Sequence, residues 1–150
     1  MAFDDTVLNL FARTVEDLQK SVNLSIKESV NKNKDVLKTM QTDEQMFAGQ
    51  TATEKAIKPS YQPSTINYKK RTGQPFDRVT LKDTGDFYKS IEIEAKANDF
   101  VISTQISYSI YLVEKYADIL GITDTNLNTF VNNYTLPVIK QNFDDIIAKS

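Results

Sequence analysis

Apolar residues along the first forty positions recur every three or four residues, which is the spacing of one face of an α-helix. The stripe consists of Leu8, Phe11, Val15, Leu18, Val22, Ile26 and Val30, and it resumes at Leu37 and Met40. We therefore expect a helix to about residue 40 and one further turn that ends at Gly49. A helix of ~40 residues is about 60 Å long. A domain of 150 residues is narrower than the length of this helix. Part of the helix is therefore expected to pack against something outside its own domain.

The pattern changes after Gly49. Pro59, Pro63, Gly73 and Pro75 are close together with serines and threonines between them, which is typical of a loop. We predict a loop over 49–77, in which residues 63–70 are compatible with one helical turn. Connections of this length are usually functional or disordered.

Short stretches of alternating polar and apolar residues follow. Residues 78–81 are short and prone to form a strand, and Gly85 sits in a turn. Residues 90–95 and 100–106 alternate with a period of two. They predict an antiparallel hairpin over about 90–106, with one buried and one solvated face.

The last third returns to helical spacing. A helix is predicted over 108–120, ended by Gly121, and a second helix begins at a cap, Thr123 or Asp124. Pro137 lies inside the second pattern and should kink or split that helix near residues 134–136.

These elements predict one α+β domain over residues 1–150. Its expected parts are a helical arm (1–48), a loop (49–77), a small sheet (78–107) and a helical C-terminal part (108–150).

The composition limits the catalytic and metal-binding chemistry that the chain can perform. The 150 residues include no cysteine and no histidine, and 40% are hydrophobic. Disulfides, thiolate metal sites, cysteine nucleophiles and the commonest general base are thereby excluded. The paired carboxylates match no calcium loop, and no glycine-rich phosphate loop is present. We therefore expect a non-enzymatic binding or assembly protein without a metal site or cofactor.

No apolar run approaches the ~20 residues that cross a bilayer. The first five residues, 1–5, are acidic rather than basic in character, which is unlike a secretory signal. The expectation is a protein of the cytosol with no membrane partner.

The net charge of −2 conceals an asymmetry. Residues 55–82 contain seven Lys or Arg and one Asp, a net charge of +6, so the remainder carries −8. Three interpretations stay open: a solvated loop, a surface that meets an acidic patch of another copy, or a nucleic-acid contact. The candidate interaction residues combine cations with aromatic rings; they are Tyr61, Tyr68, Lys69, Lys70, Arg71 and Arg78.

Two stretches resemble a known family. Residues 81–91 read Leu-Lys-Asp-Thr-Gly-Asp-Phe-Tyr-Lys-Ser-Ile, which resembles the L-x-x-T-G-x-L-x-x-S-I motif of small structural proteins of tailed bacteriophages. These are the virion-morphogenesis and tail-completion proteins of the neck, where head and tail join. Residues 108–116 are similar to the family's Y-A-x-x-x-E-x-G element, with Tyr116 and Ala117 where a glycine is usual. The resemblance extends over about residues 59–121.

The resemblance implies a non-enzymatic virion subunit, assembled in the host cytoplasm, that forms a homo-oligomeric ring at the head–tail junction or tail end. Its implied partners are further copies, other neck or tail proteins, and packaged DNA through non-specific contact. In this reading Gly85 reverses the chain, and Phe87 and Ile91 face the core. The alternative is a nucleic-acid-binding accessory protein that uses the basic segment 55–82.

Overall fold

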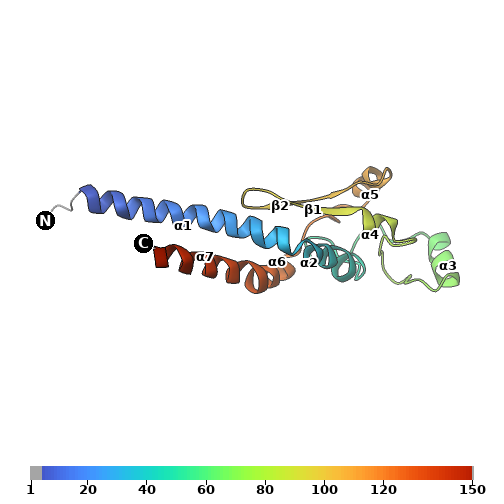
Figure 1. The fold of residues 1–150 in the computed structure, drawn as a ribbon. Coiled ribbons are helices and arrows are strands. Elements are labelled where there is room, and N and C mark those ends of the chain that lie inside the picture. The colour runs from blue at the N-terminus through green and yellow to red at the C-terminus, as the bar shows by residue number, and fades with distance from the viewer. Residues whose placement is uncertain (1–4, 150) are drawn as a thin grey trace.

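The molecule is elongated, with two antiparallel helices at one end and a lobe of short helices and a two-stranded sheet at the other (Figure 1). It is a computed structural model that describes residues 5–149. The elements are α1 (Asp5–Lys32), α2 (Lys34–Thr39), the π-helical η1 (Met40–Met46), α3 (Pro63–Arg71), α4 (Asp86–Ser90), β1 (Ile91–Ala95), β2 (Phe100–Thr104), α5 (Ser109–Lys115), α6 (Asp124–Phe130), the π-helical η2 (Val131–Thr135) and α7 (Leu136–Lys149). The predicted α+β class is confirmed.

The N-terminal helix is interrupted earlier than its apolar spacing predicted. α1 ends at Lys32, and Asn33 leaves the helical region with φ −126° and ψ 32°. The Asn33 side-chain amide donates to the Ser29 carbonyl oxygen (2.9 Å), while its backbone N–H turns to the Val30 carbonyl oxygen (3.2 Å). The side chain thus takes the acceptor that a continuing helix would use.

Beyond this break the helical path continues through α2 and η1. Gly49, with a φ of +77°, closes it as predicted. Residues 1–4 of the predicted helical arm 1–48 lie outside the described residues.

The most buried α1 side chains at its contact with η2 and α7 are small and polar, while Leu18, Val22 and Ile26 of the apolar stripe are half-buried there. Ser21, Ser25 and Ser29 recur every four residues and are buried. The Asn142 side-chain amide of α7 donates to Ser25 Oγ (2.7 Å), and the hydroxyls of Ser29 and Thr135 are 3.0 Å apart. Because serine is small, the two helices approach closely there.

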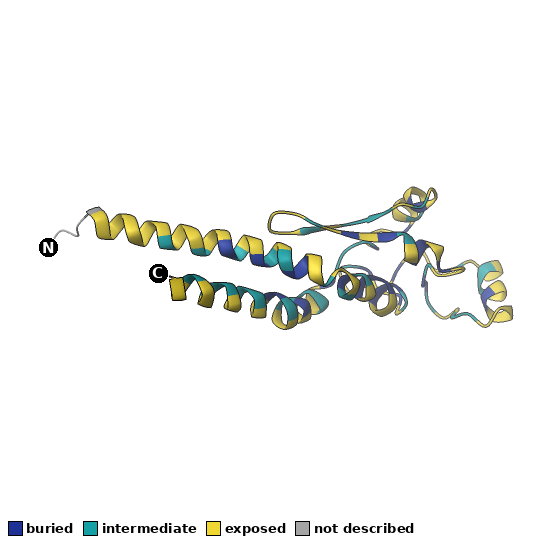
Figure 2. Ribbon diagram, viewed as in Figure 1, coloured by how far each residue is buried: buried dark blue, intermediate teal, exposed yellow. Residues whose placement is uncertain are grey.

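The apolar stripe reaches the core only at its C-terminal end. Val30 is buried, whereas Leu8, Phe11 and Val15 are exposed. Since α7 ends at Lys149, the first turns of α1 extend past it, and no other described element lies beside them (Figures 1 and 2).

The segment predicted as a loop over 49–77 contains a nine-residue helix, α3, which is longer than the single turn that residues 63–70 indicated. It begins at Pro63, a residue suited to a first helical turn. Its last turn is basic, which is favourable at a helix C-terminus.

Residues 78–81, predicted as a short strand, form none. Leu81 has a φ of +57°, outside the extended range. The backbone N–H groups of Thr80 and Leu81 donate to the Tyr61 hydroxyl oxygen at 3.0 and 3.1 Å. A tyrosine therefore supplies the acceptor that a neighbouring strand would supply, and the predicted sheet over 78–107 reduces to its hairpin.

The hairpin predicted over about 90–106 is present. β1 and β2 pair antiparallel, with Ile91 opposite Thr104 and Ala95 opposite Phe100. Along β1 the isoleucines are buried and the glutamates are exposed, as the alternation predicted.

The helix predicted over 108–120 is shorter than expected and ends at Lys115 as α5. Asp118 then adopts a φ of +59° and its carbonyl oxygen accepts from the Ala52 N–H (2.7 Å). This contact draws the chain back onto the segment after η1, which helical spacing could not indicate.

The last helices begin and divide where the sequence predicted. The Thr123 hydroxyl caps α6 by accepting from the Asn126 N–H (3.2 Å). The helical path passes through η2, and α7 restarts with Pro137 in its first turn, a position where proline is tolerated.

Two clusters of buried apolar side chains lie where the helices meet the sheet, away from the free end of α1 (Figure 2). One includes Met46, Phe87 and Ile91, and the other includes Leu37 and Ile93. Because Ile91 and Ile93 of β1 belong to different clusters, the hairpin connects the two clusters.

We predict that Gly121→Ala lowers the free energy of unfolding by about 3 kcal/mol, through backbone strain and overpacking. Gly121 has a φ of +143°, and a Cβ there would lie 2.8 Å from Ala52 Cβ. Gly73→Ala is the matched control: its φ is +70° but nothing lies within 4 Å, so it should lose only about 1 kcal/mol. Urea unfolding measures both, and equal losses would contradict the packing argument.

Candidate interaction surfaces

The six predicted interaction residues lie in and around α3, but the structure uses them differently. Tyr61, Tyr68 and Lys69 line one open cavity. Lys70 and Arg71 are exposed on the same helix. The sixth, Arg78, lies on the segment that follows.

Tyr61 and Lys69 make their contacts within the fold. Lys69 is 4% exposed, and its ammonium group donates to Gln74 Oε1 (3.0 Å) and to the Lys82 carbonyl oxygen (2.9 Å). It also lies 5.0 Å from the centre of the Tyr61 ring, a favourable cation–π distance. Together with the Tyr61 hydroxyl, Lys69 ties α3 to the chain segment that runs back toward the core.

Arg78 is likewise engaged within the chain. Its Nε donates to the Phe47 carbonyl oxygen (2.7 Å), and its guanidinium carbon lies 5.1 Å from the centre of the Phe47 ring. A second nitrogen, Nη1, donates to the Asp77 carboxylate (2.7 Å). The structure therefore leaves Tyr68, Lys70 and Arg71 as the exposed members of the predicted set.

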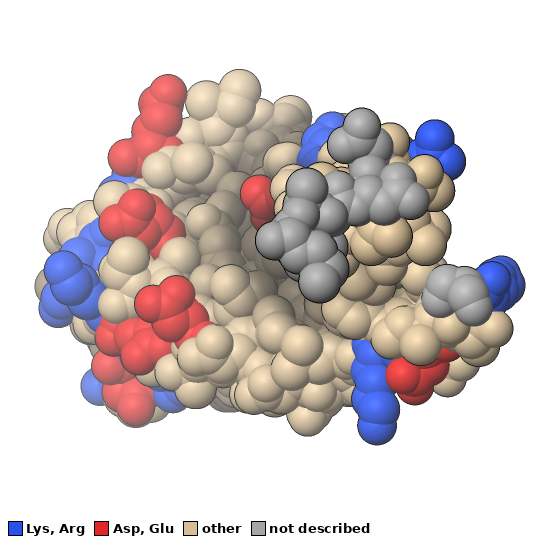
Figure 3. Space-filling model, turned by 90° about the vertical axis from the view of Figure 1, so that its left-hand side faces the viewer, with Lys and Arg blue, Asp and Glu red and all other residues tan. Residues whose placement is uncertain are grey.

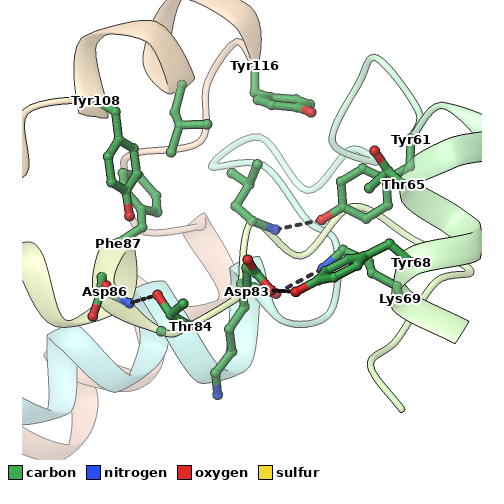
Figure 4. A pocket seen from close by; sticks show the side chains of 14 residues that line it. Tyr61, Thr65, Tyr68, Lys69, Asp83, Thr84, Asp86, Phe87, Tyr108 and Tyr116 are labelled. Carbon is green, nitrogen blue, oxygen red and sulfur yellow. Dashed lines mark hydrogen bonds between the residues drawn. The ribbon is translucent and has the colours of Figure 1, made fainter. Parts of the chain in front are cut away.

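The cavity has a volume of about 540 Å³ and opens between α3, the loop before α4, and α5. In Figure 4 the rings of Phe87 and Tyr108 lie on one side, those of Tyr61 and Tyr68 on the other, and Asp83 between them. We call this cavity the aromatic pocket. The residues of the α3 wall were predicted from the sequence, but those of the wall formed by α4 and α5 were not, because the two walls come from segments that are distant in the sequence.

Asp83 supplies a negative charge to the aromatic pocket. It accepts hydrogen bonds from Gln74 Nε2 (3.0 Å) and from the Tyr68 hydroxyl (3.1 Å). These bonds hold the pKa of the Asp83 carboxyl below its ordinary value, so the group is ionised at neutral pH. The bond to Asp83 also raises the pKa of Tyr68, which stays protonated.

A second surface is the free end of α1. Its large apolar side chains are exposed: Val7, Leu8, Leu10, Phe11 and Val15. Leu10 and Phe11 are 65% and 68% exposed. We call residues 5–17 the α1 arm. Contiguous exposed apolar side chains of this kind mark interaction sites on soluble proteins.

The outer face of α5 adds a third group of exposed apolar side chains, next to the aromatic pocket. Tyr108 belongs to both, and Ile110, Tyr111 and Val113 are also exposed. The pocket borders this face at Tyr108, and the elements that carry both lie at the end of the molecule opposite the α1 arm (Figure 1).

Charge differs between the two ends. The α1 arm carries three acidic residues and Arg13, a net charge of −2, whereas residues 55–82, which hold α3, carry +6. Viewed from the end that holds both chain termini, the molecule presents a broad uncharged area, with most charged side chains toward its edge (Figure 3).

Within residues 5–149, no helix is long and apolar enough to cross a membrane, and no group of three or more potential side-chain ligands could hold a metal ion. Comparison with protein-family models, with curated proteins and with solved structures finds no match for the chain.

We predict that Lys69→Met lowers the free energy of unfolding by about 2 kcal/mol, because the Lys82 carbonyl loses a charged donor. Amide hydrogen exchange should also rise across α3. Lys70→Met is the control, since Lys70 is exposed and lies over the Phe76 ring (4.9 Å); its effect should stay within about 0.5 kcal/mol. Equal effects would mean that the buried ammonium group stabilises nothing.

Proposed function

We propose that this protein is a structural subunit of a tailed-bacteriophage virion that assembles with further copies into a ring at the head–tail junction or tail end. It acts through its interfaces and catalyses no reaction. The observation that carries the proposal is the α1 arm, whose large apolar side chains remain 38–68% exposed. A chain that buries these side chains only against another subunit is suited to assembly.

The segment that resembles the phage family is consistent with this role. Gly85 has a φ of +88° and precedes α4, and the Thr84 hydroxyl accepts from the Asp86 N–H (3.3 Å). Phe87 and Ile91 are buried, as expected if Gly85 reverses the chain into the sheet. The motif positions Gly85, Phe87 and Ile91 thus correspond to a chain reversal and to core contacts rather than to reactive groups.

The chemistry of the aromatic pocket also favours a binding role. Its buried cation, Lys69, donates two hydrogen bonds within the chain, and Asp83 accepts two more. With no histidine or cysteine in the chain, neither group has a partner typical of acid–base or nucleophilic catalysis.

Light scattering and negative-stain microscopy of the full chain test the proposal, alone and with neck or tail proteins of a phage that encodes it. We expect concentration-dependent oligomers, ring-shaped particles, and incorporation into virions. A strict monomer that never enters virions would refute the assembly role.

Contact with nucleic acid remains the second candidate, favoured by the exposed pair Lys70 and Arg71 beside the exposed ring of Tyr68. Salt-dependent retention of the protein on DNA tests it, since phosphate contacts weaken as salt rises. Retention should fall in the double variant Lys70→Ala, Arg71→Ala. Unchanged retention, or none at low salt, would reject this function.

A further inference from the structure

The α1 arm and the aromatic pocket lie at opposite ends of one elongated subunit (Figure 1). α1 is a continuous helix of 28 residues, and it is held against α7 by the buried serines Ser21, Ser25 and Ser29. The arm therefore cannot fold back onto the pocket of its own chain. Whatever covers either surface must come from another molecule.

The two surfaces complement each other in chemistry. The arm offers aliphatic side chains and one aromatic ring, Phe11, on a rigid helix. The pocket offers aromatic walls and continues into the apolar face of α5. Aromatic and aliphatic side chains in such a cavity are the usual anchors of an interface.

Charge favours the same pairing. The arm carries a net −2, and the segment that supplies α3 carries +6. Lys70 and Arg71 are exposed on α3, which forms one wall of the pocket, and they would attract an acidic arm. Within the pocket the charges of Lys69 and Lys82 offset those of Asp83 and Asp86.

We propose that the α1 arm of one copy docks in the aromatic pocket of the next copy, an inference that rests on the proposed assembly function. The contact joins different surfaces of identical chains, so it is heterologous. Repetition closes into a ring when the rotation between neighbours allows it and otherwise extends into a filament.

A two-fold contact between two arms is the main competitor. It would cover the apolar side chains of the arm but leave the aromatic pocket and the α5 face in water. It would also bring two acidic arms together, with a like-charge penalty. The head-to-tail contact covers both apolar surfaces at once.

Cysteine crosslinking distinguishes these arrangements, because the natural chain contains no cysteine. The full-length double variant Val7→Cys, Thr65→Cys places one thiol on the exposed arm and one in the pocket wall. A bifunctional maleimide should convert it into a ladder of dimers, trimers and larger species. A mixture of the two single variants should stop at dimers that contain one chain of each kind.

The matched control replaces the pocket thiol with Asn128→Cys, at an exposed position on α6. Crosslinking of Val7→Cys, Asn128→Cys should remain at least tenfold below that of the pocket pair. Efficient self-crosslinking of the single variant Val7→Cys would instead establish paired arms and overturn the inference. A pocket pair no better than the control, in a protein that light scattering shows to be oligomeric, would overturn the inference and leave the proposed function standing.

Thr65→Glu provides a second readout without a crosslinker, because its larger side chain narrows the pocket mouth from α3 and its negative charge repels the acidic arm. We expect the concentration at half-association to rise at least tenfold, with far-UV circular dichroism unchanged. Association equal to that of the natural protein would exclude the pocket as the docking site.

Discussion

Gln45→Leu is expected to lower the free energy of unfolding by about 4 kcal/mol, because it strands several buried polar groups at once. Gln45 is 1% exposed. Its Nε2 donates to the Gly121 carbonyl oxygen (2.8 Å), and its Oε1 accepts from the Thr123 N–H (3.0 Å) and from Asn126 Nδ2 (3.0 Å). Leucine fills a similar volume and replaces none of these bonds.

The neighbouring turn shows why the effect should be large. Gln41 is fully buried, donates to the Ile119 carbonyl oxygen (2.8 Å) and accepts from the Gly121 N–H (2.7 Å). Two glutamines of η1 thus hold the backbone of residues 119–123 and attach the C-terminal third to the N-terminal helices. Loss of one glutamine should weaken the hold of the other.

The matched control is Gln50→Leu, at an exposed glutamine five residues further along. It should change stability by no more than about 0.5 kcal/mol. Urea denaturation followed by far-UV circular dichroism measures both variants. Equal midpoints for Gln45→Leu and the natural protein would show that the buried amide contributes little.

The double variant Leu10→Glu, Phe11→Glu should raise the concentration at half-association about thirtyfold or more, the usual effect of removing central apolar anchors. Both side chains are about two-thirds exposed in the monomer (65% and 68%). Their replacement therefore removes little intramolecular burial, and the unfolding free energy should change by less than about 1 kcal/mol. Light scattering over a dilution series measures association, and urea denaturation measures stability.

Asn9→Glu is the control on the same arm, since it adds one negative charge at an exposed polar position without removing an apolar side chain. Its effect on association should stay within about threefold and should shrink as salt rises. If Asn9→Glu weakens association as much as the double variant, charge rather than apolar burial governs assembly. If the double variant unfolds more easily, the arm has an intramolecular role that its exposure does not reveal.

The local sequence pattern correctly predicted those elements that are determined by residues close together in the chain. The alternation along β1 and β2 gave their pairing, and Thr123 and Pro137 marked the start and the division of the last helices. Gly49 closed its helix because the required φ suits glycine. Residues 78–81 failed as a strand because their N–H groups bond to Tyr61, about twenty positions earlier.

The candidate site divides in the same way. Sequence identified the basic and aromatic residues of α3, but it could not separate exposed Lys70 from buried Lys69, which are adjacent and chemically identical. That distinction depends on Gln74 and on the Lys82 carbonyl oxygen. The α5 wall of the pocket was missed for the same reason, since no spacing rule relates it to α3.

By itself the sequence determined the fold class, the hairpin, the absence of thiol and imidazole chemistry, and a long first helix, although not its end at Lys32. These follow from composition and short-range periodicity, which act within a few residues. Only the tertiary structure decided which face of α1 contacts α7 and which Lys and Arg side chains of the basic segment remain exposed to solvent. The most buried α1 side chains at this contact are serines, whereas the stripe residues Leu18, Val22 and Ile26 are half-buried. How closely two helices approach depends on the size of the side chains at their contact, and the spacing of hydrophobic residues alone does not predict which side chains those are.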